Sequence, residues 1–297
     1  MSRLFRRQTT GGVKDSAGYT AFRVLNVVAL VAICFVTLYP FLNVLAVAFS
    51  SQGYINAGQV SIWPRGFNLT TFQMVMSDPL FWRNYGNTVV YTTVATAIAM
   101  VLTTTFAYAL SKKRLKGRAF FVGLAVFTMF FSGGLIPNYV LVNSLGFRNT
   151  IWAIVIPNAI SIFNLLVMKS FFENFPEDLE EAASIDGLTT YGILWKIVLP
   201  LSKAVIATMV LFYAVTFWNS WFSAVLYMSK PELYPVTVYL RNLLMAASAP
   251  AGSDEGLQIA ANVKAVTMLL TTLPILCLYP FLQKYFVSGV MLGSVKA

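Results

Sequence analysis

Histidine is absent from this sequence of 297 residues, and charged side chains are scarce. Charged residues make up 11% of the chain and hydrophobic residues 58%, whereas a soluble domain carries about 25% charged residues. Without histidine and with only two cysteines, Cys34 and Cys277, the chain lacks the side chains for histidine-based acid–base chemistry and for typical metal centres. Each cysteine lies in a long apolar run with no close partner, so we expect two inert thiols.

Ionisable side chains are also missing from the apolar runs. None of the runs contains Asp, Glu, Lys or Arg; they cover residues 24–50, 86–111, 119–142, 150–168, 204–228 and 265–283. Ion-coupled transporters usually place such groups within the membrane. This argues strongly against proton coupling and less strongly against sodium coupling, because carbonyl and hydroxyl oxygens can hold sodium.

A nucleotide-binding P-loop is excluded as well. That motif needs a Gly-Lys pair, and the pair does not occur in the sequence. If the chain moves a solute uphill, a partner has to supply the energy.

The runs predict an all-α, polytopic membrane protein with six transmembrane helices, since each run can cross about 30 Å of hydrocarbon. The first run follows basic residues and ends in Ala46-Val47-Ala48, which resembles a signal-peptide cleavage site. Its apolar stretch is too long for a typical signal peptide, so we expect an uncleaved helix.

The basic residues predict the orientation. With six spans, fifteen of the 21 Lys and Arg residues fall on the side that holds both termini, which places the termini in the cytoplasm. The predicted organisation is a cytoplasmic segment 1–23, a transmembrane domain 24–287 that includes a cytoplasmic loop 173–203, and a cytoplasmic tail 288–297. Because the charges flank spans and form no isolated basic face, nucleic-acid binding is not expected.

Proline and glycine predict where spans bend and where loops lie. Pro40, Pro137, Pro157, Pro274 and Pro280 fall within runs, and Gly133-Gly134 adds a soft point to the third. Bent helices suit a gated pathway, although they also occur in membrane proteins without one. Outside loops are expected at 51–85, with Pro64 and Pro79, and at 229–264, with a flexible stretch at 248–256.

The loop 173–203 is the main concentration of acid, with six of the eleven carboxylates at 173–186. Pro176 and the acids after it predict a helix start, Leu179, Ala182, Ala183 and Ile185 share roughly one side, and Gly187 suits a left-handed helix end. A second amphipathic helix is expected at 189–198, stopped by Pro200. The residues alone leave two interpretations open: docking of another protein, or a helix pair on the membrane surface with a solvated acidic face.

A spaced motif in this loop resembles a known family. Glu181-Ala182-Ala183 is followed after three residues by Gly187 and after nine more by Ile197-x-Leu199-Pro200. This is similar to the cytoplasmic motif of permease subunits of bacterial ABC importers, and the resemblance extends from about residue 24 to the C-terminus. The stretch 131–158 and the tail 283–297 are similar to the carbohydrate branch, the maltose-type permeases, and to oligo- and polysaccharide importers such as alginate-type systems.

The resemblance implies a fold, a location and partners. The chain would be a multi-pass permease of the bacterial inner membrane and no enzyme, pairing with a second permease, two ATP-binding subunits and a periplasmic or lipid-anchored binding protein. ATP and Mg would bind to the ATPase subunits, and this chain would hold no cofactor and no metal. The residues expected to couple the chain to the ATPase are Glu180, Glu181, Ala182, Ala183, Ser184, Asp186, Gly187, Leu199 and Pro200.

Saccharide contacts are expected from aromatic, amide and hydroxyl side chains of the spans. The candidates are Asn158, Ser161, Asn164, Tyr213, Trp218, Asn219 and Trp221, with Asn138, Tyr139, Asn143, Phe217 and Ser223 nearby. Each can instead serve in interhelical hydrogen bonding, and the tryptophans can lie in an interfacial belt. For an acidic polysaccharide, Arg83, Arg241 or Lys264 would supply the cation near the outer mouth.

Three other functions fit the sequence less well than a saccharide permease. An ABC permease for peptides or amino acids is disfavoured by the tail, and an ion-coupled secondary carrier by the missing ionisable groups. A membrane scaffold without a pathway is disfavoured by the polar stripe Asn158, Ser161 and Asn164.

Overall fold

The computed structural model describes residues 17–246 and 261–291, with side chains to residue 277, and no strand occurs within these ranges. The predicted flexible stretch 248–256, residues 1–16 of the N-terminal segment and residues 292–297 of the tail lie outside them. The chain divides into two compact units, residues 1–68 and 69–297.

The first unit consists of a long apolar helix and a folded-back loop. α1 (Ala17–Ala48) contains the first predicted span, and a short α2 (Gln52–Asn56) follows. The loop returns to the end of α1, because the Asn43 side-chain amide donates to the Ser61 carbonyl at 2.8 Å and Asn68 N–H donates to the Phe49 carbonyl at 3.0 Å. The second bond satisfies a carbonyl that the helix end leaves open, and the first holds the loop against the last turns of the helix.

The second unit is built around α4 (Pro79–Ser111), which follows α3 (Thr70–Ser77). α4 begins earlier than the predicted span at 86–111, because Asp78 caps it. The Asp78 carboxylate accepts from Leu80 N–H at 2.8 Å, and Pro79 occupies the first helical position. The prediction of Pro79 in an outside loop is wrong, because the residue lies in the first turn of α4.

Two of the predicted spans are bent where glycine or a cap residue interrupts the helix. Run 119–142 forms α5 (Arg118–Phe130) and α6 (Leu135–Ser144), which meet at 113°. Gly134 provides the left-handed φ of 87° at that corner. Run 150–168 forms α7 (Trp152–Val155), η1 (Ile156–Asn158) and α8 (Ile162–Glu173), with a 50° bend.

The fifth run is also interrupted. α12 (Lys203–Trp218) ends before Asn219, and α13 (Phe222–Tyr227) follows. The Asn219 amide donates to the Val215 carbonyl at 2.8 Å, a local bond of the kind that competes with helix continuation. The predicted span over 204–228 is therefore not one continuous helix.

The remaining segments complete this unit. η3 (Pro231–Leu233) and α14 (Val236–Ala246) follow α13, and α15 (Ala261–Met291) contains the sixth predicted run. α14 is tied to α4, since the Tyr239 hydroxyl donates to the Asp78 carboxylate at 2.6 Å.

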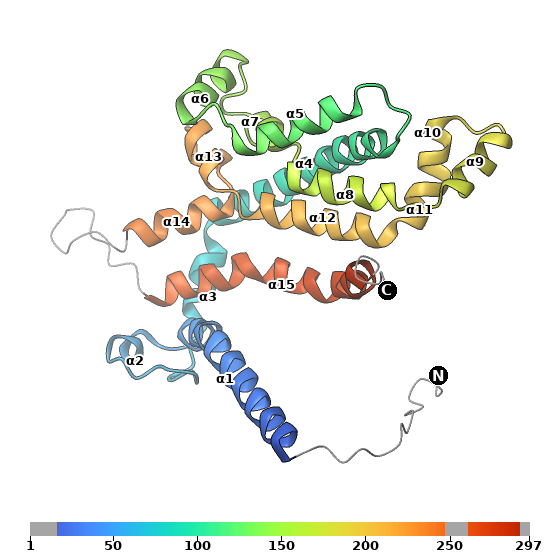
Figure 1. The fold of residues 1–297 in the computed structure, drawn as a ribbon. Coiled ribbons are helices and arrows are strands. Elements are labelled where there is room, and N and C mark those ends of the chain that lie inside the picture. The colour runs from blue at the N-terminus through green and yellow to red at the C-terminus, as the bar shows by residue number, and fades with distance from the viewer. Residues whose placement is uncertain (1–16, 247–260, 292–297) are drawn as a thin grey trace. The chain divides into compact units, whose positions relative to one another are not determined.

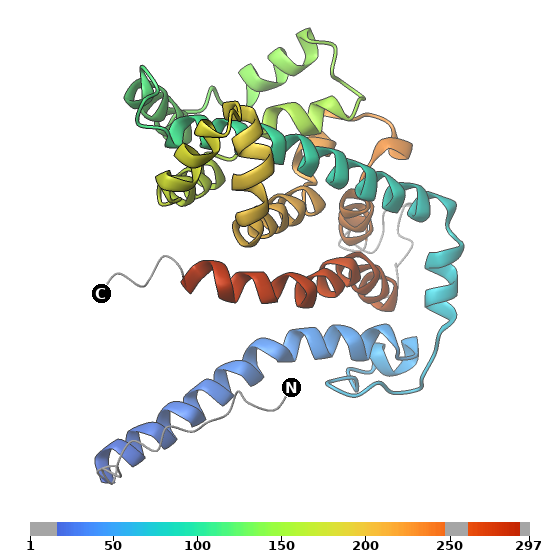
Figure 2. The ribbon, with the colours of Figure 1, turned by 90° about the vertical axis from the view of Figure 1, so that its right-hand side faces the viewer.

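The core of this unit lies where α4 packs against α8 and α12, and α12 packs against α15. Figures 1 and 2 both show α15 alongside α12. Ala95, Ala99 and Ala107 on α4 are fully buried, and such small side chains let helices approach closely in membranes.

By length and composition, α1 and α4 can each cross a membrane, and the total reaches five if each bent pair counts as one span. The third such pair joins residues 190–201 to α12 at 86°. Each of the six predicted runs is mostly helical, with breaks in the third, fourth and fifth, whereas the number of crossings and the side of the termini stay predictions.

Candidate functional site

The acidic loop folds as two short helical segments at one end of the second unit, and α6, α13 and α14 lie at the other end (Figure 1). The first segment, α9 (Glu177–Ile185), begins directly after Pro176. Glu177, Asp178 and Glu180 occupy its first turn, where negative charge is favoured by the helix dipole. The predicted helix is confirmed, with Pro176 at its N-cap rather than inside the first turn.

Gly187 ends α9 as predicted, with a left-handed φ of 83°. Leu188 N–H donates to the Ala183 carbonyl at 3.0 Å, and Gly187 N–H donates to the Ser184 carbonyl at 3.1 Å. These two bonds form a Schellman motif, which satisfies carbonyls that the helix end would otherwise leave open. A Cβ at Gly187 would meet no atom within 4 Å, so the constraint at this position is the backbone angle rather than space.

The two alanines of the motif lie on different faces of α9. Ala183 is 4% exposed and belongs to a buried cluster with Leu165, Met168 and Phe172, whereas Ala182 is exposed. Ile185, which we expected on the same apolar side, is 87% exposed. The prediction of one shared apolar side was therefore wrong, because only Ala183 points toward the chain's own core.

The two glutamates also differ. Glu180 pairs with Lys112, and its side chain is only 14% exposed. Glu181 is exposed and has no hydrogen bond or ion pair with any described part of the chain. Ser184 and Asp186 are exposed as well. The outer face of α9 therefore offers Glu181, Ala182 and Ile185 to a partner.

The second segment is longer than predicted and runs past Pro200. It comprises α10 (Thr190–Ile193), a π-helical turn η2 (Leu194–Val198) and α11 (Leu199–Leu201). Proline cannot donate to the carbonyl four residues before it and crowds that carbonyl, and the wider π-turn lies directly before it. Leu199 and Pro200 thus lie in the helix, and the chain breaks at Ser202 instead.

This segment presents one face to the chain and another outward. Ile193, Leu194 and Val198 are buried in the same cluster as Ala183. Tyr191 and Trp195 are 76% and 60% exposed. This amphipathic character was predicted, and it leaves aromatic side chains beside the outward face of α9.

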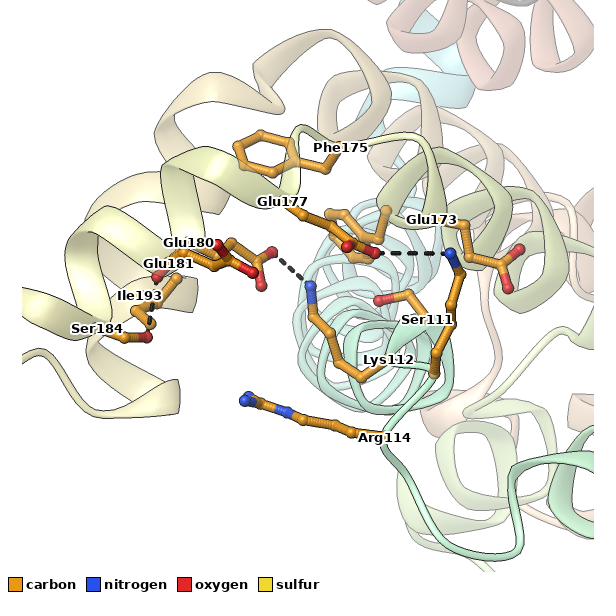
Figure 3. Close-up of a pocket in the computed structure, with 12 residues that line it drawn as sticks. Ser111, Lys112, Arg114, Glu173, Phe175, Glu177, Glu180, Glu181, Ser184 and Ile193 are labelled. Carbon is orange, nitrogen blue, oxygen red and sulfur yellow. Dashed lines mark hydrogen bonds and ion pairs between the residues drawn. The ribbon is translucent and has the colours of Figure 1, made fainter.

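A half-open cavity of about 300 Å³ separates α9 from the basic stretch 112–114 that follows α4 (Figure 3). Besides the Lys112–Glu180 pair, Lys113 approaches Glu177 at 3.8 Å. Glu181 and Ser184 also line the cavity. The pairing of this basic stretch with α9 was not predicted from the sequence. The sequence did hold a signal for this pairing, because a basic loop and an acidic loop are both predicted on the cytoplasmic side.

A second charge cluster joins α5 to α8. Arg118, the first residue of α5, forms an ion pair with Glu173, and Lys169 also reaches Glu173 at 2.8 Å. Arg118 additionally donates to the Leu110 carbonyl at 2.8 Å. This cluster ties helix ends together and does not include α9.

The predicted saccharide residues near the centre of the unit are engaged in contacts between helices. The Tyr213 hydroxyl is 2.6 Å from Thr103 Oγ1 and accepts from Ser161 N–H at 3.0 Å. Ser161 caps α8 by accepting from Asn164 N–H at 3.4 Å. Tyr213 and Asn164 are 2% and 5% exposed. These bonds hold the bend before α8 against α4 and α12, and a pathway role for these residues stays a prediction.

Trp218, Asn219 and Trp221 lie at the end of α12, away from α9. Trp218 is buried, and its indole N–H donates to the Thr271 carbonyl at 3.0 Å. Asn219 is exposed. Trp221 is 40% exposed and has the Arg241 guanidinium over its ring at 4.8 Å. Of the three, Asn219 and Trp221 are accessible in this structure.

One cavity brings together three of the polar candidates. A space of about 340 Å³ between α6, η1 and α13 is lined by Asn138, Asn158 and Ser223 among mostly apolar side chains. Tyr139 and Tyr227 stack nearby, with ring centroids 6.1 Å apart. The amides and the hydroxyl come from three separate predicted spans.

Neither of these regions resembles a metal centre. Within the described ranges, no group of three or more Cys, Asp or Glu side chains lies close enough to hold an ion. A separate ATPase as the site of ATP and Mg stays a prediction.

Comparison with known proteins identifies the family. Residues 22–291 match the model of the family described as "Binding-protein-dependent transport system inner membrane component". The chain belongs to this family. The resemblance drawn from the motif between Glu181 and Pro200 is thereby confirmed.

Of three similar proteins, two are named for a polysaccharide. Protein LplC of Bacillus subtilis (strain 168) is 41% identical over 93% of this chain and 95% of its own length. The polygalacturonan/rhamnogalacturonan transport system permease protein YtcP of the same strain is 38% identical over 90% of this chain and 95% of its own length. Among solved structures, a chain of a bacterial ABC transporter involved in the import of the acidic polysaccharide alginate is similar, with a TM-score of 0.85 and 30% identity, over 93% of this chain and 100% of that one.

Proposed function

We propose that this chain is the permease subunit of an ABC importer and forms half of a translocation pathway for an oligo- or polysaccharide. A binding protein delivers the saccharide, a second permease forms the other half, and two separate ATPase subunits bind ATP and Mg. The observation that carries the proposal is the family match over residues 22–291, together with the outward face of α9, on which Glu181 stands exposed beside Ala182.

The loop is suited to transmit movement. α9 is a rigid helix of nine residues, ended by the Schellman bonds at Gly187 and attached to the core through Ala183. A subunit bound to the outer face of α9 would move this helix as a rigid unit. The helices packed against it would then follow by rigid-body rocking. Ala182 allows a close approach of the partner, and Glu181 provides a polar contact.

The saccharide that we propose carries carboxylates. YtcP is named for polygalacturonan and rhamnogalacturonan, and the similar solved transporter for the acidic polysaccharide alginate. Polymers of uronic acids need a cation for recognition, and the predicted spans contain none. The cation has to come from the predicted outer loops.

Arg241 on α14 meets this need best among the cations that we considered. Its guanidinium lies over the exposed Trp221 ring at 4.8 Å, and it forms no ion pair with the described part of the chain. Arg83 instead donates to the Glu232 carbonyl at 3.2 Å, which fixes it in place. An aromatic face beside a guanidinium suits a sugar ring with a carboxylate, because arginine binds carboxylates in a bidentate manner.

The experiment is to co-purify the chain with its partner subunits and binding protein and to measure ATP hydrolysis with a panel of oligosaccharides. We expect oligogalacturonates or similar acidic oligomers to stimulate hydrolysis more than neutral maltooligosaccharides. Arg241→Gln should raise the half-saturating concentration of the acidic oligomer at least about tenfold, since a hydrogen bond to a charged group contributes about 1.5–3 kcal/mol.

Arg148→Gln is the matched control. Arg148 is also predicted on the outer side and donates to the Ser229 hydroxyl at 3.0 Å. The Arg148→Gln variant should leave the half-saturating concentration of the acidic oligomer unchanged. Stimulation by peptides or amino acids with no response to any saccharide would contradict the proposed substrate class.

A further inference from the structure

Glu180 lies beside Glu181 in sequence, and both side chains line the cavity between α9 and the stretch 112–114, but Glu180 is largely covered whereas Glu181 is exposed. Its carboxylate forms an ion pair with Lys112 and accepts from the Tyr108 hydroxyl at 3.4 Å. Lys112 caps the C-terminus of α4, and Tyr108 lies one turn earlier. The side chains of Glu180 and Lys112 are 14% and 18% exposed. Figure 3 shows the two charges directed toward each other across the gap between α9 and α4.

The contact continues into the core. The Lys112 ammonium lies 4.4 Å from the centre of the Tyr108 ring, and the edge of that ring meets Phe172 of α8, with centroids 5.9 Å apart. Tyr108 and Phe172 are 4% and 2% exposed. Glu180 is therefore joined through two side chains to α4 and α8, which pack directly on each other.

Apolar packing alone attaches α9 weakly. Ala183 is its one buried residue, and a methyl group removes little apolar area from water. Leu179 is 44% exposed. A partly desolvated ion pair with a further hydrogen bond is then a major part of the attachment, because screening is weaker there than at the surface.

A neighbouring ion pair between the same two helices is longer and far more exposed. Lys113 and Glu177 also join the end of α4 to α9, but at 3.8 Å with side chains 85% and 71% exposed. Exposed pairs of this kind contribute little. The Arg118–Glu173 pair does not reach α9 at all. The polar link between α9 and α4 is thus concentrated at Glu180.

We propose that Glu180 and Lys112, together with the Tyr108 hydroxyl, form a positioning contact that transmits the movement of α9 to α4. This inference rests on the proposed function, since it assumes that an ATPase moves α9. Glu180 acts within its own chain and does not touch the ATPase, whereas Glu181 faces the partner. Glu181 thus serves docking, and Glu180 serves the transmission of movement.

The test uses the complete importer in proteoliposomes and measures the saccharide molecules taken up per ATP hydrolysed. We expect Glu180→Gln and Lys112→Gln each to leave the ATPase bound and hydrolysing while uptake per ATP falls about five- to tenfold, a typical size for coupling between sites. The double variant should be no worse than either single variant, because both remove one contact. The exchanged pair, E180K with K112E, should restore at least half of the ratio.

Lys113→Gln and Glu177→Gln are the matched controls and should keep the wild-type ratio. The proposal is overturned if the Glu180 and Lys112 variants keep that ratio, if their effects add, or if the exchanged pair restores nothing. Loss of the ATPase from the Glu180→Gln complex also overturns it, since Glu180 would then be a docking residue. If the wild-type complex shows no saccharide-stimulated hydrolysis, the proposed function fails instead.

Discussion

Gly187 is the one residue of the loop 173–203 with a left-handed backbone conformation. Its φ of 83° lies in the left-handed region, and open space surrounds the place of a Cβ. Gly187→Val should therefore destabilise the turn by about 1–2 kcal/mol, the cost of this conformation for a residue with a side chain, and should lower uptake per ATP. Gly187→Asn should retain more activity, because asparagine tolerates such helix ends.

Gly192 provides the control, since it lies in α10 of the same loop without a left-handed angle. A Cβ there would meet Leu188 and Thr189 at 3.5 Å, an ordinary contact distance. Gly192→Ala should leave uptake per ATP near the wild-type value. An equal loss in both variants would show that the loop tolerates no added side chain, and the argument from φ would be wrong.

The contact between Asp78 and Tyr239 gives a dependence of stability on pH. Burial and, to a lesser degree, the hydrogen bond to the Asp78 carboxylate raise the pKa of Tyr239 above its ordinary value of 10. The folded state thus favours the neutral phenol, and the stabilisation is fully present below pH 10. It is lost as the pH rises from 10 through the raised pKa.

Thermal unfolding in detergent between pH 8 and 11 measures this effect. The wild type should lose more stability above pH 10 than Tyr239→Phe, which has no phenol to ionise. Parallel curves for the two proteins would contradict the assigned role of the Asp78 contact.

At the residue scale, the sequence predicts what is set by neighbours along the chain. Gly187 was predicted from the helix that precedes it and from the motif spacing. The difference in burial between Glu180 and Glu181, and between Ala182 and Ala183, was not. It depends on which face of α9 meets Phe172 and Lys112, and such contacts are absent from a local pattern.

At the scale of elements, a variant of Tyr213 tests whether the polar stripe of Asn158, Ser161 and Asn164 holds helices together or lines a pathway. The Tyr213 hydroxyl forms hydrogen bonds with the Thr103 hydroxyl on α4 and with the Ser161 N–H before α8. Tyr213→Phe leaves buried polar groups without a partner, which costs about 1–3 kcal/mol. We expect a lower unfolding temperature in detergent and an unchanged half-saturating saccharide concentration.

Tyr91→Phe is a suitable comparison for Tyr213→Phe. The Tyr91 hydroxyl also donates to another element, the Leu233 carbonyl at 3.0 Å, without joining the bend at Ser161. If Tyr213→Phe changed the saccharide concentration dependence at full stability, Tyr213 would be a pathway residue.

The bends between elements were only partly predictable. Gly133-Gly134 marked a soft point, and the structure places a 113° corner there. The break at Asn219 was missed, because hydropathy stays high on both sides of it. An apolar run shows that a segment prefers the membrane, but not whether its helix is continuous.

At the scale of the whole molecule, the predicted orientation can be tested by cysteine labelling. Cys34 and Cys277 are free thiols and would first be replaced. In that background, Lys116→Cys should react with an impermeant thiol reagent only from the cytoplasmic side, and Glu232→Cys only from the outside. Labelling of both positions from one side would contradict six crossings with cytoplasmic termini.

The family and its general architecture followed from the sequence, because motif spacing, composition and missing ionisable groups are properties of the chain itself. The kinds of partner followed only from the family resemblance, since the exposed faces of α9 and Trp221 show their chemistry but not what covers them. The two units, residues 1–68 and 69–297, are likewise a property of packing that no sequence pattern marked.

The most direct test of the account is saccharide uptake into proteoliposomes that hold the chain with its second permease, ATPase subunits and binding protein. We predict uptake that requires internal ATP and the ATPase, does not respond to a proton or sodium gradient, and falls per ATP hydrolysed in Gly187→Val. Uptake by this chain alone, driven by an ion gradient without ATP, would contradict the account.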